Sequence, residues 1–221
     1  MKKIAIITAM NEEAEHIILL YWLTEIKKLQ NITFYENENI ILALAGIWKI
    51  QASIATTYIL WNYDISKIIN IWIAGSLLWD KSNIWDVFFV TKISQHDMYL
   101  PFDWEHLDYA KKEIFIENSI EIDVDEFLFW VKLNAYCLTW DQFIDNKKTV
   151  EELYWKYSAD VIEMEAFAIA SVAREYWVLE KCIFIKAISD WADNDAKDAH
   201  MGNLDFAMEN SLQVLKKILS K

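Results

Sequence analysis

Glycine is almost absent from this chain. The 221 residues include only 3 Gly but 12 Trp, whereas an average content of about 7% glycine would give roughly 15. Tight turns often require a positive φ, which glycine adopts without steric cost. The chain must therefore form such turns with other residues.

Several tryptophans stand where a turn would use glycine. Five are next to an acidic residue in a turn-like segment: Trp79, Trp85, Trp104, Trp140 and Trp191. Two interpretations are open. Either exposed rings stack on sugars or bases, or the gene reads UGA as glycine and has been translated here with UGA as tryptophan. The turn positions favour the second interpretation, which requires UGA codons at these positions.

Other scarce features exclude several locations. No uncharged run approaches 18 apolar residues, so we expect no membrane-spanning helix. The N-terminal segment 1–10 leads directly into acidic residues and has neither the long apolar region nor the cleavage site of a signal peptide. Cys137 and Cys182 fit no redox or metal spacing, which predicts reduced core thiols and a cytoplasmic protein.

Charge and histidine content restrict the partners. The net charge is −13 and no basic cluster exceeds a lysine pair, which argues against a nucleic-acid partner. A single uncharged nucleoside is not excluded, because it carries no phosphate to be repelled. Neither His96 nor His200 has a second ligand at a suitable spacing, so we expect no metal.

Strands and helices alternate along the chain, which predicts one α/β domain over residues 1–221 with a central sheet between helices. Short apolar runs predict strands at 3–9, 32–36, 39–45, 68–74, 86–94, 133–139, 160–163 and 183–188. Periodic apolar positions predict helices at 11–29, 48–62, 147–156, 164–176 and 203–219. Asn11 is the expected N-cap of the first helix, and Ile50 and Ile54 mark the apolar face of the second. The polar segment 95–115 predicts a long loop.

Acidic residues follow three of the predicted strands. They are Glu12 with Glu13, Glu163 with Glu165, and Asp190. Ligands of α/β sheets bind at the carboxyl ends of strands. Taken singly, each acid has a structural explanation, since acids stabilise helix N-termini and Asp favours turns. Their order along the chain is more informative.

The ordered motifs resemble a known family when each Trp is read as Gly. They are A-M-N-E-E, G-I-W-K, N-I-W-I-A-G-S-L, I-W-D-V-F-F-V, T-W-D-Q-F-I, V-I-E-M-E-A-F-A-I-A and K-A-I-S-D-W-A-D. The set resembles the 5′-methylthioadenosine/S-adenosylhomocysteine nucleosidases of the purine nucleoside phosphorylase-like superfamily, over nearly the whole chain and most weakly at 95–130. Five tryptophans fall on glycines of the family pattern, which supports the glycine interpretation: Trp48, Trp72, Trp85, Trp140 and Trp191.

The resemblance implies a three-layer α/β/α sandwich around a twisted mixed sheet, and a homodimer without a cofactor. It also implies an enzyme that hydrolyses the N-glycosidic bond of methylthioadenosine or S-adenosylhomocysteine, releasing adenine and a 5′-thio-substituted ribose. Such a reaction passes through an oxocarbenium-like state and needs one acid and one base. Two carboxylates in different environments can fill these roles.

Site residues follow from the matching motifs. The resemblance makes Asp190 the acid that protonates the purine, Glu13 the base that activates water, and Glu165 the carboxylate that binds the ribose hydroxyls. Adenine would stack on one ring and be read by backbone groups at the next residue. The further substrate-binding residues implied are Met10, Ile73, Phe143, Ile144, Met164, Lys186 and Ser189. The segment His96 to Tyr99 would line the substrate tail.

Departures from the family pattern leave alternatives open. Ile73 stands where the family often has Ser near the water, so the hydroxyl is lost and the placement of the water is weakened or shifts to Ser76 or to a backbone group. Lys186 replaces an Arg and loses its two-pronged geometry. Arg174 is the only arginine and lies outside the motifs, so water is favoured over phosphate as nucleophile. Because I-A-G-S also occurs in futalosine hydrolases, that activity is the alternative. A catalytically inactive nucleoside-binding protein follows if the tryptophans are real.

Overall fold

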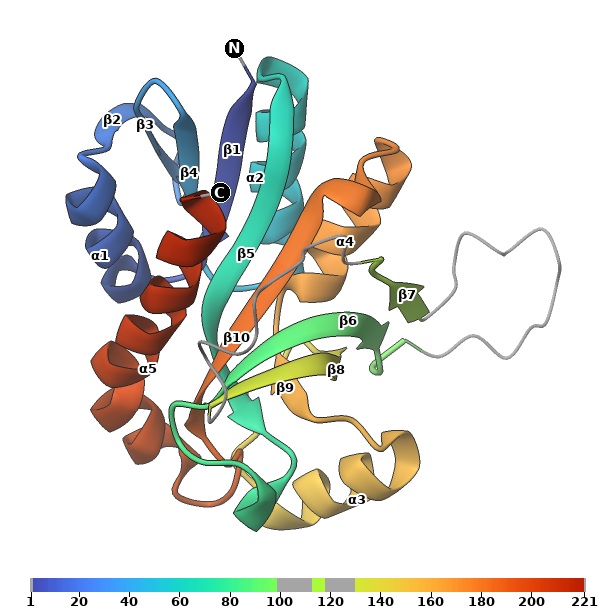
Figure 1. Ribbon diagram of the computed structural model, residues 1–221. Helices are drawn as coiled ribbons and strands as arrows, with labels where there is room; N and C mark the ends of the chain where they lie inside the picture. The colour runs from blue at the N-terminus through green and yellow to red at the C-terminus, as the bar shows by residue number, and fades with distance from the viewer. Residues whose placement is uncertain (1, 99–112, 118–129, 221) are drawn as a thin grey trace, which may run out of the picture.

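The computed structural model describes residues 2–98, 113–117 and 130–220 (Figure 1). Its strands are β1 (Lys3–Thr8), β2 (Thr24–Lys28), β3 (Thr33–Glu36), β4 (Ile40–Leu44), β5 (Ile65–Ser76), β6 (Val87–Gln95), β7 (Glu113–Phe115), β8 (Val131–Thr139), β9 (Val161–Glu163) and β10 (Cys182–Asp190). Its α-helices are α1 (Asn11–Tyr21), α2 (Lys49–Asn62), α3 (Lys147–Tyr157), α4 (Ala166–Glu175) and α5 (Ala196–Leu219).

These strands form one mixed sheet in the order β10-β6-β8-β9-β5-β1-β4-β3-β2, with β7 paired to β6. β5 runs parallel to β1 and to β10. β6 pairs antiparallel with β10, and β9 pairs antiparallel with β5. β10 also pairs with β5, so the strands β10, β6, β8, β9 and β5 form a closed ring of neighbours. The mixed sheet that the resemblance implied is therefore confirmed.

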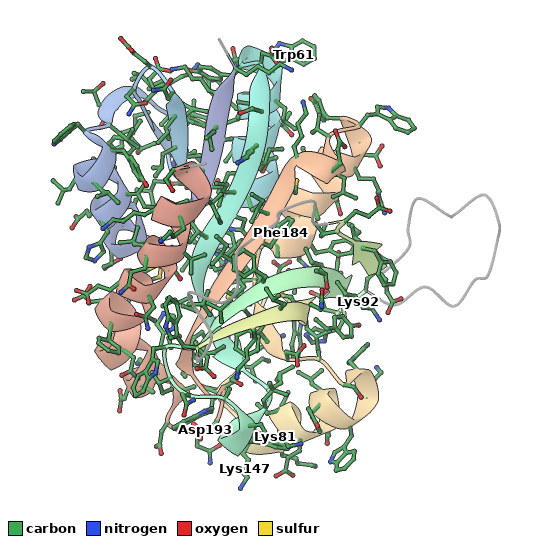
Figure 2. All side chains as sticks on the ribbon, in the orientation of Figure 1. Trp61, Lys81, Lys92, Lys147, Phe184 and Asp193 are labelled. Atoms are coloured by element: carbon green, nitrogen blue, oxygen red, sulfur yellow. The ribbon has the colours of Figure 1, made fainter. Side chains whose placement is uncertain are left out.

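Helices cover both faces of the sheet (Figure 1). The α1 and α5 side chains join one apolar cluster, which includes Ile17 and Leu215. The α2 and α4 side chains join a second cluster on the opposite face, which includes Ala55 and Ile169. Phe184 of β10 lies inside the molecule and is 1% exposed, whereas Trp61 projects from the end of α2 (Figure 2). The three-layer arrangement is confirmed.

Two helix boundaries differ from the prediction. α1 ends at Tyr21 because Trp22 adopts a left-handed conformation with φ 49°, and residues 24–28 form β2 instead of continuing the helix. Met10, not Asn11, occupies the N-cap position. α5 begins at Ala196, seven residues before the predicted start, and its first turns are polar. Part of the predicted loop at 95–115 is β7, while Tyr99, Pro101 and Trp104 lie outside the described residues.

The apolar face expected for α2 is not the buried one. Ile50 is 71% exposed and Ile54 45%, while the small side chains of Ala52 and Ala55 are fully buried. Those alanines pack beneath α4, whose own buried face is also rich in alanine. Close packing of the two helices thus uses the small residues and leaves the isoleucines outside.

Five tryptophans in the described part of the chain adopt positive φ. They are Trp22, Trp48, Trp79, Trp85 and Trp177, with φ of 49°, 95°, 47°, 81° and 58°. Bulky residues rarely adopt these values. Gly46 shares the conformation with φ 82°. The turn prediction is therefore confirmed for Trp79 and Trp85 but wrong for Trp140 and Trp191, which do not have positive φ.

Candidate active site

A cavity of about 100 Å³ opens where β1, β5, β9 and β10 end. This edge collects side chains that are far apart in the sequence, because the parallel strands β1, β5 and β10 finish there and the antiparallel strand β9 pairs with the end of β5. Eight of the predicted site residues line the cavity: Met10, Glu13, Ile73, Phe143, Ile144, Met164, Glu165 and Asp190. Glu13, Glu165 and Asp190 therefore border the same enclosed space.

The carboxylate of Glu13 is held by backbone N–H groups. Oε2 accepts hydrogen bonds from Ala9 (3.0 Å) and Met10 (2.9 Å), and Oε1 accepts one from Ile73 (3.3 Å). The residue is 1% exposed. Burial raises the pKa of Glu13 from 4.5 to about 7, although these N–H groups and the charge of Lys186 oppose the shift. A carboxylate with this pKa can accept a proton near neutral pH.

Asp190 ends β10 and is 2% exposed. Its Oδ1 accepts the backbone N–H of Ala192 at 2.8 Å, and its Oδ2 accepts the Ser189 hydroxyl at 2.7 Å. Gly75 leaves room for this carboxylate, because a Cβ there would lie 3.0 Å from Oδ1 of Asp190. A side chain at residue 75 would therefore crowd Asp190 and require it to shift.

Glu165 lies at the N-cap of α4 and is 4% exposed. Its Oε1 accepts the backbone N–H of Trp48 at 2.9 Å, which ties it to the start of α2. Burial first, and then the neighbouring charge of Glu163, raise the pKa of Glu165 from 4.5 to about 8. The N-termini of α2 and α4 thus meet at the cavity.

A buried network lies behind the cavity wall. Lys186 Nζ is 2.9 Å from Oε2 of Glu163 and 2.7 Å from Oδ1 of Asn70. Oε1 of Glu163 accepts the Thr139 hydroxyl at 2.6 Å. Burial alone would raise the pKa of Glu163, but the charge of Lys186 and these hydrogen bonds lower it below its ordinary value. Glu163 itself borders the cavity, and Lys186 contacts it from behind.

Two predicted substrate-binding residues do not line the cavity. Lys186 is fully buried and points into the network with Glu163, and Ser189 is fully buried against Asp190. Their assignment to substrate contact is not supported, because the Lys186 side chain is engaged by Glu163 and the Ser189 hydroxyl by Asp190. Both act through a carboxylate that borders it.

The proposed substitute for the missing hydroxyl is also misplaced. Ser76 hydrogen bonds with Ser82 at 2.6 Å and receives the N–H of Leu78, away from the cavity. The other alternative was an unspecified backbone group, and the backbone N–H of Ile73 does donate a hydrogen bond to Glu13.

The segment expected to line a substrate tail lies elsewhere. His96 packs edge-on against Trp140, with ring centroids 4.5 Å apart. Lys49 Nζ is 2.8 Å from the Asp97 carboxylate. Neither residue lines the cavity, nor does Met98, and Tyr99 falls outside the described residues. Among the described residues, no group of three or more His, Cys, Asp or Glu side chains is placed to hold a metal ion. The same residues include no helix long and apolar enough to cross a membrane.

Sequence reasoning missed His200 at the cavity. His200, considered only as a metal ligand, lines it because α5 begins earlier than predicted. Trp72 lines it from β5, and its Nε1 donates a hydrogen bond to Glu163 at 3.1 Å. The polar start of α5 gave no apolar periodicity from which the position of His200 could be predicted.

The sequence and the fold are both similar to those of known proteins. Residues 132–220 match the model of the phosphorylase superfamily. The structure superposes on the methylthioadenosine/S-adenosylhomocysteine nucleosidase of Neisseria meningitidis with a TM-score of 0.87 and 24% identity, covering 99% of both chains. The chain has the nucleoside phosphorylase-like fold.

Sequence similarity to proteins with this fold extends over the whole chain. An aminodeoxyfutalosine nucleosidase of Helicobacter pylori is 28% identical over 100% of this chain and 99% of its own length. The methylthioadenosine/S-adenosylhomocysteine nucleosidase of Bacillus subtilis is 28% identical over 99% of both. The crystal structure of the H. pylori methylthioadenosine/S-adenosylhomocysteine nucleosidase superposes with a TM-score of 0.84 at 28% identity. The superposition covers 99% of this chain and 98% of that one. The chain is thus similar over its whole length to bacterial nucleosidases that have this fold.

Proposed function

We propose that this protein is a purine nucleosidase that hydrolyses the N-glycosidic bond of methylthioadenosine or S-adenosylhomocysteine. The products are adenine and a 5′-thio-substituted ribose. The observation that supports this most directly is the meeting of Glu13, Glu165 and Asp190 at one cavity. The similar nucleosidases of B. subtilis and H. pylori support the same reaction class.

In this proposal each carboxylate has its own role. Protonated Asp190 donates its proton to the five-membered ring of the purine as the glycosidic bond breaks. Glu13 removes a proton from the water that attacks the oxocarbenium-like sugar. Glu165 accepts hydrogen bonds from the ribose hydroxyls. The reaction consumes one water and needs no other reactant.

The remaining cavity residues would hold the nucleoside. Phe143 is 45% exposed at the cavity, where its ring can stack on adenine, and buried Ile144 would present backbone groups to the adenine edge. Met10 and Met164 would pack against the sugar. Uncharged stacking and backbone contacts suit an uncharged base.

A related nucleosidase activity is the second candidate. The H. pylori relative that is named an aminodeoxyfutalosine nucleosidase is as similar as the methylthioadenosine nucleosidases. Both substrate classes would place their purine against Asp190 and differ at the 5′ substituent. Parallel assays with methylthioadenosine and aminodeoxyfutalosine, compared by kcat/KM, decide between them.

We also propose that glycine occupies the 12 tryptophan positions in the natural protein. Among the described residues, five of the eight non-glycine positions with positive φ are tryptophans. Such conformations cost a bulky residue roughly 1–3 kcal/mol each. The cavity of about 100 Å³ is also smaller than the roughly 300–1,000 Å³ of typical ligand sites. Glycine at Trp72 would enlarge it.

Expression of two versions of the chain tests the glycine proposal. One carries the printed sequence and the other carries glycine at all 12 positions. We expect adenine release from methylthioadenosine only by the glycine version. Activity confined to the tryptophan version, or UGG codons at these positions in the gene, would contradict the proposal. Nucleoside binding without turnover by both versions would instead indicate a non-enzymatic binding protein.

We propose that the protein is a homodimer in the cytoplasm. Ile50 and Ile54 of α2 are exposed, and a groove beside them is lined by Tyr58, Trp61 and Tyr176. Burial of this apolar face against a second copy would stabilise the pair. The two cysteines are buried and free, as suits a reducing compartment. A monomer in sedimentation equilibrium would contradict the dimer.

The direct test of the catalytic assignment is Asp190→Asn in the version of the chain that is active. Because the amide has no acidic proton to give, we expect kcat to fall about 10²- to 10⁴-fold. Asp198→Asn, at an exposed position on the first turn of α5, is the matched control. Unchanged adenine release by Asp190→Asn would remove Asp190 from the mechanism.

A further inference from the structure

His200 is the titratable side chain that contacts Asp190 within the described part of the chain. It lies on the second turn of α5 and lines the cavity. Its Nδ1 is 3.4 Å from Oδ2 of Asp190 and 3.2 Å from the Ser189 hydroxyl. That hydroxyl is in turn 2.7 Å from Oδ2 of Asp190. The three side chains form a closed hydrogen-bonded triangle.

Two further contacts fix the position of His200. Asn203 of α5 donates from Nδ2 to the backbone oxygen of Ser189 at 3.0 Å, which ties the helix to the end of β10. The Phe143 ring meets the imidazole edge-on, with centroids 5.4 Å apart. The imidazole is therefore held between the proposed adenine-stacking ring and the proposed acid.

Exposure distinguishes His200 from Asp190. The Asp190 side chain is 2% exposed and the His200 side chain 18%. After each turnover the proposed acid is left as a carboxylate that must regain a proton, but it has almost no surface of its own from which to take one. His200 contacts both Asp190 and solvent.

We infer that His200 is the proton relay that recharges Asp190 between turnovers. The inference rests on the proposed function. Asp190 gives its proton to the departing purine, and imidazolium His200 then transfers its Nδ1 proton to Oδ2 of Asp190, directly or through the Ser189 hydroxyl. The neutral imidazole regains a proton from solvent. Glu13 releases the proton of the attacking water, so the proton count balances over the cycle.

The charges around His200 suit this transfer. The titratable groups that line the cavity with it are all acidic: Glu13, Glu163, Glu165 and Asp190. A cation at residue 200 is therefore not opposed by a positive neighbour in the cavity. Lys186, the cation behind the wall, is engaged by Glu163 and Asn70.

The test replaces His200 in the version of the chain that releases adenine. His200→Phe keeps a ring against Phe143 but removes both nitrogens, and His200→Ala leaves space for free imidazole. We expect both changes to lower steady-state kcat by about tenfold or more with little change in KM. The first turnover, which uses the proton already on Asp190, should keep its rate. Added imidazole should restore kcat to His200→Ala in proportion to imidazolium concentration.

His16 provides the matched control, because it lies on α1 beside Asp205 and outside the cavity. His16→Ala should retain full activity. Unchanged kcat in both His200 variants would overturn the relay, as would a loss that appears equally in the first turnover and resists imidazole. If neither version of the starting chain releases adenine, the proposed function fails. If a version is active and only these His200 results disagree, the relay alone fails.

Discussion

Glu13 and Glu163 are buried glutamates on the same cavity, but their surroundings differ. The Glu13 carboxylate accepts only backbone N–H groups, and burial raises its pKa to about 7. The Glu163 carboxylate has Lys186 at 2.9 Å, and its pKa is lowered. Both residues are buried, so the opposite shifts of their pKa values come from the direct cationic partner that only Glu163 has.

The difference divides the site into a reactive part and a supporting part. Without a direct cation, Glu13 can change its protonation state near neutral pH, as a general base must. With one, Glu163 stays ionised and accepts the N–H groups of Glu165 and Ala166 at 3.1 Å and 2.8 Å. Those contacts fix the start of α4, where Glu165 borders the cavity.

The largest expected effect is on the reactive side. Glu13→Gln keeps the size of the side chain but cannot accept a proton from water, so kcat should fall about 10²- to 10⁴-fold. Steady-state adenine release measures it. Glu12→Gln is the control, because Glu12 is exposed one residue earlier on α1. Equal activities of the two variants would contradict the role of Glu13 as the general base.

The supporting side should respond mainly in stability. Lys186→Met leaves Glu163 as an unpaired buried charge, which should lower the free energy of unfolding by roughly 3–5 kcal/mol. Urea denaturation at pH 7 measures the loss, and Lys186→Arg is the charge-conserving control. A Met variant that is as stable as the Arg variant would show that the Lys186–Glu163 pair does not support the site.

A smaller effect is the pH dependence of stability. The pKa of Glu13 is higher in the folded protein than its ordinary 4.5, so the folded state binds this proton more tightly. Its contribution is fully present below pH 4.5 and is lost as the pH rises through about 7, a loss on the order of 3 kcal/mol. Glu13→Gln should flatten this part of the unfolding curve and Glu12→Gln should not. An unchanged slope in Glu13→Gln would contradict the raised pKa.

Much of the fold could be predicted, since β4 is a continuous apolar run and β5 and β10 are mostly apolar. The end of α1 could not, because it depends on the left-handed Trp22, and helix propensity gives no signal for this conformation. The convergence of Glu13, Glu165 and Asp190 was expected only through the family resemblance.

The network behind the cavity was beyond sequence reasoning. Lys186 faces Trp72 across the β5–β10 register, and Glu163 reaches it from β9 at 2.9 Å. Strand register across three separated segments brings these residues together, and no local pattern encodes it. Lys186 and Ser189 were expected at the substrate only because the family resemblance implied it.

The most direct measurement of the central claim follows the oxygen of water into the sugar. The active version of the chain is incubated with methylthioadenosine in ¹⁸O-labelled water containing inorganic phosphate, and the products are examined by mass spectrometry. Hydrolysis with Asp190 as acid and Glu13 as base predicts free adenine and a thio-substituted ribose that carries one ¹⁸O. An unlabelled sugar 1-phosphate, or no adenine from either version of the chain, would contradict it.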